Sequence, residues 1–283
     1  MSIPFKAALE GKTAVVTGGA GVLCSGFAKA LAECGAKVAV LNRTLERGEK
    51  VAQEIRSGGG QAIAVQCDVL SRESVEAAYQ KVLAAYGKCD ILINGAGGND
   101  AEATTQDEFF NADEALSGGI KSFFDLEEKG IERVMGLNFT GVFRTTQQFA
   151  KDMIGRPGGV IINISSMNAY TPLTKIPAYS GAKAAVSNFT QWLAVYFAKA
   201  GIRVNAIAPG FFSTSQNAKL LWNSDGSPTK RAEKILNNTP TGRFGVPDDL
   251  TGTLLYLVDN ACSGFVTGVV IPVDGGFSAY SGV

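Results

Sequence analysis

The sequence contains no histidine. Mechanisms that rely on a histidine base, the Ser-His-Asp triad among them, are therefore excluded, and so are metal sites with imidazole ligands. Any acid–base chemistry must fall to tyrosine, lysine, aspartate, glutamate or cysteine side chains.

Net charge, paired cysteines and long apolar runs are also missing. The 26 basic and 26 acidic residues balance, which argues against nucleic-acid or anionic-membrane partners. No apolar run approaches the ~20 residues of a membrane-spanning helix, and the amino terminus lacks the apolar core of a secretory signal. The five cysteines are odd in number and include no CxxC pair, so we expect reduced thiols in a cytoplasmic protein.

Short β-branched segments alternate with helical patterns along the whole chain. Near-continuous apolar character is typical of parallel strands buried on both faces. The alternation predicts one α/β domain over 1–283, a doubly wound parallel sheet (Rossmann fold) with helices on both faces. The predicted strands are 13–16, 37–41, 62–66, 91–94, 160–164, 203–206 and 269–272, and the predicted helices are about 22–34, 44–57, 71–86, 130–154, 178–199 and 247–258.

Two stretches interrupt this alternation. Residues 98–130 carry nine acidic and two basic side chains with four interspersed phenylalanines, which indicates a packed insertion. Residues 211–240 contain clusters of glycine, proline, asparagine and serine around a short helical pattern. Both stretches follow predicted strands, where open α/β sheets bind ligands, so we expect 211–240 to form a substrate lid.

Tyr179 and Lys183 lie four residues apart in the run Tyr179-Ser-Gly-Ala-Lys183. This spacing places both side chains on one face of a helix. A phenol beside an ammonium is a tuned acid, because the positive charge stabilises the phenolate and lowers its pKa. Such a pair suits proton transfer at an alcohol or carbonyl carbon, although the same spacing also arises by chance on exposed helices.

The ends of the predicted strands carry cofactor-binding signals. The first strand runs into Thr17-Gly-Gly-Ala-Gly21 before a helix, a turn that lets backbone approach a pyrophosphate, although plain tight turns use glycine too. The second strand ends in Asn42-Arg43, where an arginine can pair with a ribose 2′-phosphate and no acid is present to hold the 2′-hydroxyl. We therefore expect NADP(H) to be preferred, with NAD(H) as the alternative. Asp68 ends the third strand, where its carboxylate would lie near an adenine amine, and Asn94 ends the fourth, where the backbone would touch a ribose or stabilise the sheet. Each could equally be a cap or a turn residue.

These motifs, in this order, resemble the short-chain dehydrogenase/reductase family over essentially the whole chain. The resemblance also rests on Asn138 in Leu137-Asn-Phe-Thr-Gly141, on Ser166 in Asn163-Ile-Ser-Ser166, and on Pro209-Gly-Phe-Phe-Ser-Thr214. Cys24 departs from the pattern, because it stands where the family has its third glycine. A thiol there could crowd the first helical turn or the cofactor.

The resemblance implies a reaction and its residues. Ser166 binds the substrate oxygen, Tyr179 passes the proton, Lys183 lowers the tyrosine pKa and holds the nicotinamide ribose, and Asn138 positions a water. Hydride moves to or from the nicotinamide, no metal is needed, and the family's usual assembly is a homotetramer. The cofactor residues so predicted are Gly18, Gly21, Val22, Leu23, Asn42, Arg43, Asp68, Val69, Asn94, Ala96, Gly97, Tyr179, Lys183, Pro209, Gly210, Phe212 and Thr214.

Local strings refine the resemblance to a bacterial subgroup described as D-mannonate oxidoreductases or fructuronate reductases. They include Pro172-Leu-Thr-Lys-Ile-Pro-Ala-Tyr179 and the ending Asp274-Gly-Gly-Phe-Ser-Ala-Tyr-Ser-Gly-Val283. Polar neighbours of the catalytic residues suit a hydroxylated sugar acid, with Lys175 as the partner of its carboxylate. The predicted substrate residues are Asn99, Asn168, Lys175, Gln216 and Asn217.

Other functions stay open. A gluconate or a polyol/ketose dehydrogenase fits the same residues, and an acyl ketoreductase would need more apolar residues around 168–176. A non-catalytic dinucleotide-sensing protein would be expected to have lost Tyr179 or Lys183, and both are present.

Overall fold

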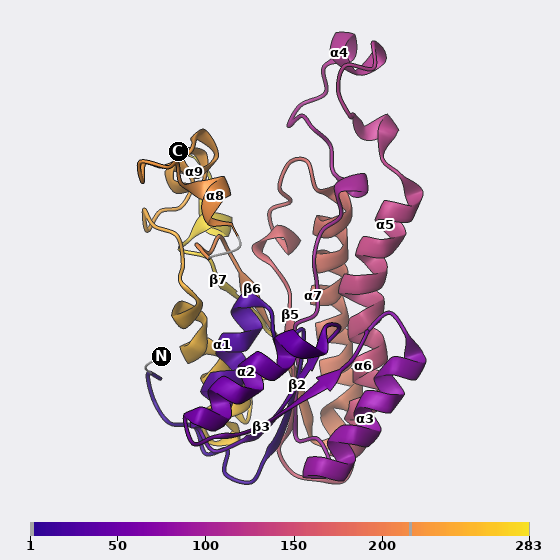
Figure 1. Cartoon of the computed structure of the whole chain (residues 1–283), viewed down its shortest axis with the longest axis vertical. Coiled ribbons are helices and arrows are strands. Elements are labelled where there is room, and N and C mark those ends of the chain that lie inside the picture. The colour runs from indigo at the N-terminus through magenta and orange to yellow at the C-terminus, as the bar shows by residue number, and fades with distance from the viewer. Residues whose placement is uncertain (1–2, 215–216, 283) are drawn as a thin grey trace.

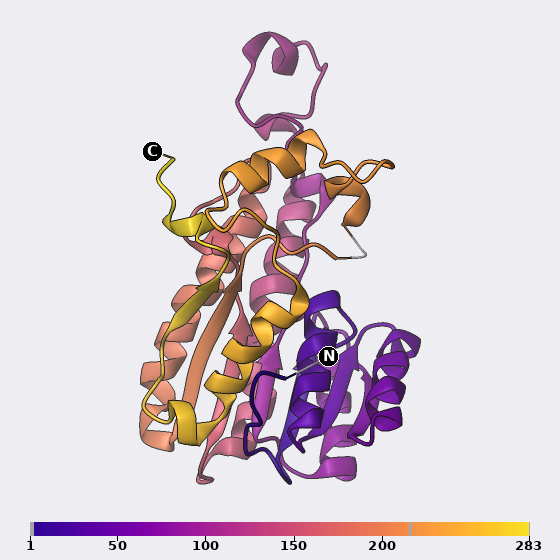
Figure 2. The same ribbon diagram turned by 90° about the vertical axis from the view of Figure 1, so that its left-hand side faces the viewer.

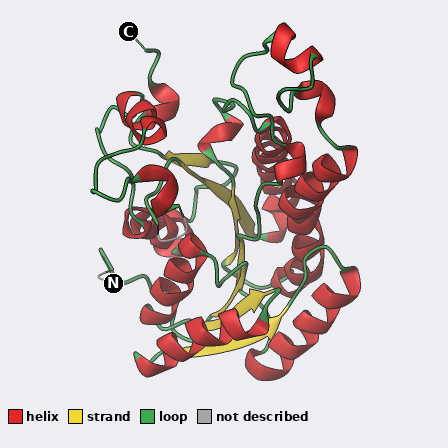
Figure 3. Cartoon of the chain, turned by 45° about the horizontal axis from the view of Figure 1, so that its top comes forward, coloured by secondary structure: helices red, strands yellow, loops and turns green. Residues whose placement is uncertain are grey.

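A computed structural model describes residues 3–214 and 217–282. These residues form one seven-stranded, wholly parallel sheet with the order β3-β2-β1-β4-β5-β6-β7. Figure 3 shows this sheet with helices on either side of it. The doubly wound fold predicted from the alternation is therefore confirmed. The strands are β1 (Thr13–Thr17), β2 (Lys37–Asn42), β3 (Gln61–Gln66), β4 (Ile91–Asn94), β5 (Gly159–Ile164), β6 (Ile202–Pro209) and β7 (Val270–Val273).

Helices cover both faces of the sheet (Figures 1 and 2). One apolar core joins the sheet to α1, α2 and α10, through residues such as Phe27 and Leu254. A second core joins the other face to α3, α6 and α7, through residues such as Phe149 and Leu193. The helices are α1 (Val22–Glu33), α2 (Leu45–Ser57), α3 (Arg72–Tyr86), α4 (Ala112–Leu116), α5 (Glu128–Met135), α6 (Gly141–Phe149), α7 (Pro177–Phe197), α8 (Ala218–Leu221), α9 (Lys230–Asn237), α10 (Thr251–Val258) and α11 (Asn260–Ser263).

The predicted helix over 130–154 is interrupted at its centre. The helix α5 ends at Met135, the π-helical turn Gly136–Thr140 follows, and α6 begins at Gly141. Insertions of this kind are rare and concentrate at functional sites. Asn138 lies inside this turn.

The position of the ligand crevice follows from the strand order. Strand β1 pairs with β2 on one side and β4 on the other, so the chain's winding direction reverses between them. Loops leaving the carboxyl ends of β1 and β4 then diverge and leave a crevice above the sheet. The glycine-rich turn after β1 and the Asn94-Gly-Ala-Gly97 run after β4 both lie at this point.

The insertion 98–130 projects beyond the sheet as an arm that carries α4 (Figures 1 and 2). Phe124 contacts Phe110 and Phe123 edge to face, but the phenylalanines stay exposed, Phe109 by 80% and Phe124 by 74%. The prediction that these phenylalanines pack the insertion is therefore wrong for the single chain, because so short an arm offers them no core to enter. Its acidic side chains are partly paired, Asp100 and Glu102 with Arg133.

The segment 211–240 carries α8 and α9 at the same end of the sheet as the crevice (Figure 2). Two of its hydrogen bonds organise the turn after β6, where Asn217 Oδ1 accepts from the amide of Thr214 at 2.8 Å and Asn217 Nδ2 donates to the carbonyl of Phe212 at 2.8 Å. The predicted substrate residue Gln216 lies outside the described residues.

An aromatic face remains exposed on α7. Trp192 stacks on Tyr196 with ring centroids 4.8 Å apart, and the two side chains are 54% and 65% exposed. Subunit contacts would cover such a face, and the homotetramer stays a prediction. Within the described residues, no helix is both long and apolar enough to cross a bilayer.

Candidate active site

Helix α7 brings Tyr179 and Lys183 to the end of β5. Pro177 begins this helix, a position that suits proline because its amide hydrogen would have no helical partner. The Lys183 ammonium donates to the carbonyl of Ile164 at 2.9 Å and lies 5.5 Å from the centroid of the Tyr179 ring. Ser166 follows β5 directly, and its hydroxyl hydrogen-bonds to Tyr179. The predicted catalytic residues therefore converge.

Burial shifts both ionisable groups toward their neutral forms. It lowers the pKa of Lys183 from 10.5 to about 8, and it raises the pKa of Tyr179 above its usual 10 despite the hydrogen bond from Ser166. The pKa of the tyrosine is therefore not lowered in this arrangement as expected, because burial removes the phenolate from water and outweighs the opposing effect of the Ser166 hydroxyl. Tyr179 is therefore protonated near neutral pH.

Asn138 ties the loop after β4 to its own helical segment. Its amide nitrogen donates to the carbonyls of Gly98 at 2.7 Å and Val134 at 2.8 Å, and its Oδ1 accepts from the Gly98 amide at 3.2 Å. A methyl group at Gly97 would lie 2.7 Å from Asn138 Oδ1 and 3.2 Å from Lys183 Nζ. Both side chains thus converge on Gly97, and only Oδ1 of Asn138 retains capacity to hold a water beside Lys183.

A cavity of about 390 Å³ joins these catalytic residues to the glycine-rich turn. Among the described residues no side chain caps the amino end of α1, so its first amides face the cavity and can bind an anion. Gly18 has φ of +62°, and a Cβ there would lie 2.8 Å from Ala96 Cα. This cradle fits a pyrophosphate. The predicted residues that line the cavity are Gly18, Gly21, Val22, Leu23, Gly97, Ser166, Tyr179, Lys183, Pro209, Gly210, Phe212, Thr214 and Asn217.

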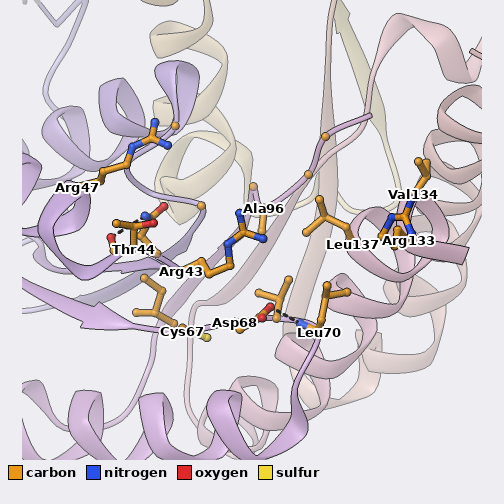
Figure 4. Close-up of a pocket in the computed structure, with 18 of the residues that line it drawn as sticks. Arg43, Thr44, Arg47, Cys67, Asp68, Leu70, Ala96, Arg133, Val134 and Leu137 are labelled. Carbon is orange, nitrogen blue, oxygen red and sulfur yellow. Dashed lines mark hydrogen bonds between the residues drawn. The ribbon is translucent and has the colours of Figure 1, made fainter. Parts of the chain in front are cut away.

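A second cavity of about 490 Å³ shares Gly18, Gly21 and Gly97 with the first and extends toward β2 and β3 (Figure 4). Asn42, Arg43, Asp68, Val69 and Ala96 line it, as expected for an adenosine end. Asn99, which was predicted to contact substrate, lines it as well. The side chain of Arg43 extends toward Ala96 in Figure 4. Arg47 lines the same cavity and was missed, although its position one helical turn after Arg43 was a usable signal.

Three predicted contacts are engaged within the protein. Asn94 is 1% exposed and its side chain donates to Thr146 and Asn163, so of the two alternatives it stabilises the sheet. Asn168 is 4% exposed, and its backbone amide donates to the Ser166 hydroxyl at 3.2 Å, which orients the serine instead of meeting substrate. Asn217 lines the catalytic cavity, but its amide is committed to the turn after β6.

Cys24 does not obstruct the cofactor cradle. Its side chain is 4% exposed and its thiol lies 3.8 Å from the carbonyl of Gly95. A Cβ at Gly95 would lie 2.2 Å from Cys24 Sγ, so a glycine at 95 accommodates the thiol at 24. Burial raises the pKa of Cys24 to about 12, so the group is a neutral packing residue.

A third cavity of about 640 Å³ continues from the catalytic one and shares Phe211 with it. Lys175 and Asn99, two of the predicted substrate residues, line it. Helix α9 supplies three further basic side chains that sequence reasoning missed, Lys230, Arg231 and Lys234. Only the tertiary fold brings α9 over the loop before α7, so no sequence signal pointed to them.

Comparison with known proteins gives a consistent family. Residues 12–224 match the family model described as short chain dehydrogenase. An uncharacterized oxidoreductase of Haemophilus influenzae is 56% identical over 283 residues, covering 100% of this chain and 99% of that protein. The 2-dehydro-3-deoxy-D-gluconate 5-dehydrogenase of Dickeya dadantii is 33% identical over 272 residues, covering 96% of this chain and 97% of that protein.

Two solved structures add ligands to this picture. A candidate D-mannonate oxidoreductase of Haemophilus influenzae, crystallised with bound NAD, superposes with a TM-score of 0.94 at 57% identity over 98% of both chains. A gluconate 5-dehydrogenase of Burkholderia cenocepacia, crystallised with NADP and tartrate, gives a TM-score of 0.80 at 31% identity over 96% of this chain and 97% of that one.

Proposed function

The chain belongs to the short-chain dehydrogenase family, and on this premise we propose that it transfers hydride between a nicotinamide cofactor and a sugar acid, D-fructuronate/D-mannonate in particular. One observation carries the proposal. The cavity that holds Ser166, Tyr179 and Lys183 shares its glycine-rich turn with the cavity extending toward β2 and β3. It shares Phe211 with a third cavity, which is lined by four basic side chains.

The nicotinamide supplies or accepts the hydride. Ser166 hydrogen-bonds the substrate oxygen, and Tyr179 gives its phenolic proton to that oxygen in reduction or takes it back in oxidation. Burial keeps Tyr179 protonated near neutral pH, which favours its role as an acid toward a ketone. Lys183 is anchored by the carbonyl of Ile164, and Asn138 holds the Gly98 backbone beside it.

A gluconate 5-dehydrogenase activity is the second candidate. Relatives named for gluconate and dehydrogluconate oxidation cover nearly the whole chain, and the basic cavity suits any sugar acid. Lys175 is our proposed carboxylate contact in either case. A protein that only senses dinucleotide would have no need of the intact Ser166, Tyr179 and Lys183 set.

A substrate panel tests this proposal. Absorbance of the reduced nicotinamide should fall fastest with D-fructuronate, with kcat/KM at least about tenfold above that for neutral D-fructose, because only the acid gains a charged hydrogen bond. Faster turnover of 5-keto-D-gluconate would favour the second candidate. Absence of turnover with every keto acid, in enzyme that still binds NADPH, would contradict both.

We also propose that NADP(H) is preferred over NAD(H), because Arg43 and Arg47 line the adenosine end and Asn42 stands where an acid would hold the ribose. Changing Arg43 to Ser should lower kcat/KM for NADPH by about 10- to 100-fold and leave NADH nearly unchanged, since a charged hydrogen bond to phosphate is lost.

The matched control is Lys50→Ala, which removes a positive charge from an exposed position of α2. It should leave the NADPH/NADH ratio at the parental value. An equal loss for both cofactors in Arg43→Ser would show that the arginine does not bind the 2′-phosphate.

A further inference from the structure

The third cavity lies beyond the catalytic centre. It shares Phe211 with the catalytic cavity and Asn99 with the adenosine cavity, but Ser166 and Tyr179 line only the catalytic one. The segment before α7, helix α9 and the arm residue Glu108 form its walls. A substrate whose reacting carbon lies at Tyr179 therefore places a different part of its chain in this third cavity.

The charge of this cavity is positive. Lys175, Lys230, Arg231 and Lys234 face a single acidic residue, Glu108. Lys234 forms an ion pair with Glu108, which neutralises both and ties the arm to α9. Among the described residues, Lys175, Lys230 and Arg231 form no ion pair with a carboxylate, so three positive charges remain for an anion.

The backbone holds Lys175 against this cavity in an unusual conformation. Its φ is +74°, in the left-handed region, and it is the one non-glycine residue with positive φ in the described part of the chain. Its carbonyl accepts from the amide of Thr105 in the arm at 2.9 Å. Strained residues of this kind persist where the surrounding structure enforces them, commonly at ligand sites.

We propose that the third cavity is a carboxylate subsite in which Arg231 is the principal ligand and Lys175 the second. An arginine guanidinium binds a carboxylate through two parallel hydrogen bonds, which a lysine cannot provide. Because this subsite and the Ser166–Tyr179 centre occupy different cavities, the substrate carries its carboxylate several carbons away from the reacting carbon. The inference rests on the proposed function and deepens it.

The substrate class follows from this separation. Acids whose carbonyl adjoins the carboxylate, such as 2-keto-D-gluconate, cannot place one group at Tyr179 and the other at Arg231. Their isomers with a remote ketone, such as 5-keto-D-gluconate, can do so. Arg231 thus selects for the position of the carboxylate as well as for its charge.

Steady-state kinetics of Arg231→Gln test the inference. We expect KM for D-fructuronate, whose ketone is also remote from its carboxylate, to rise by about 10- to 100-fold with kcat little changed, because a charged hydrogen bond is lost away from the reacting atoms. Arg231→Lys should restore part of the loss. Lys219→Gln on α8, exposed and outside the cavity lining, should match the parent enzyme. In the parent, 2-keto-D-gluconate should be the poorer substrate.

Calorimetric binding of D-mannonate to the enzyme saturated with NADP⁺ separates this inference from the proposed function. Mannonate binding that disappears in Arg231→Gln supports the subsite even where turnover of keto acids is undetectable. Equal binding by parent and Arg231→Gln, or no binding by the parent, overturns the subsite even if sugar acids are turned over. Parental NADPH affinity in the variant shows that it is folded.

Discussion

Replacing Tyr179 with Phe should reduce turnover by about 10³- to 10⁴-fold while nicotinamide binding stays near the parental value. The change removes one hydroxyl, the group that exchanges the proton with the substrate oxygen. The aromatic ring, which lies 5.5 Å from the Lys183 ammonium and packs with Ala182 and Val134, is retained. Turnover in both directions, with cofactor affinity from fluorescence titration, measures the two effects separately.

Tyr196→Phe is the matched control, because Tyr196 lies on the same helix with its side chain 65% exposed. It should keep parental turnover. Near-parental activity of Tyr179→Phe would contradict the assignment of Tyr179 as the proton donor. A parallel loss of cofactor affinity would instead indicate that the hydroxyl holds the dinucleotide.

Replacing Lys183 with Met should have opposite effects on activity and stability. Turnover should fall by about 10²-fold or more, because the ammonium that supports Tyr179 is lost. Burial lowers the Lys183 pKa from 10.5 to about 8, a penalty on the charged form on the order of 3 kcal/mol at neutral pH. Loss of the hydrogen bond to Ile164 offsets about 1 kcal/mol of that relief, so the variant should unfold in urea at a higher concentration than the parent.

The pH dependence of stability gives this prediction its sign. Lys183 has a lower pKa folded than unfolded, so the folded state binds its proton less tightly. The contribution of Lys183 to the free energy of unfolding is therefore greatest above pH 10.5, where the amine is neutral in both states. This contribution is lost as the pH falls from 10.5 through about 8. As the pH rises from about 8 to 10.5, the parent should therefore gain stability relative to Lys183→Met. Lys199→Met, at an exposed site just beyond α7, is the control and should show the same dependence of stability on pH as the parent. Identical stability profiles for the parent and Lys183→Met would contradict the burial of this charge.

Much of the fold and of the cofactor groove could be predicted from local patterns. Apolar runs such as Val160–Ile164 specify buried strands because they have no polar face to expose to water. The turn from Gly18 to Gly21 and the Tyr179–Lys183 spacing specify their geometry within a few residues. In such features the residues that contact one another are also close in sequence.

Features that depend on burial were predicted poorly. Asn94 and Asn168 resembled contact residues because asparagine is frequent in loops, yet the fold buries both. Phe109 and Phe124 looked like a small core, yet the arm carries them into solvent. The pKa of Tyr179 was expected to fall from the nearby charge alone, whereas the surrounding protein removes water from the phenol and raises it.

The sequence by itself determined the parallel sheet, the dinucleotide turn and the Ser166–Tyr179–Lys183 chemistry, because each depends on residue type and short-range spacing. Only the tertiary structure decided how deeply these groups are buried and what lies across from them. Arg231 and Lys175 meet at one cavity although more than fifty residues separate them, because α9 folds back over the segment before α7. Contacts across such distances follow from packing of the whole chain, and in our proposal they select the substrate that reaches the catalytic pair.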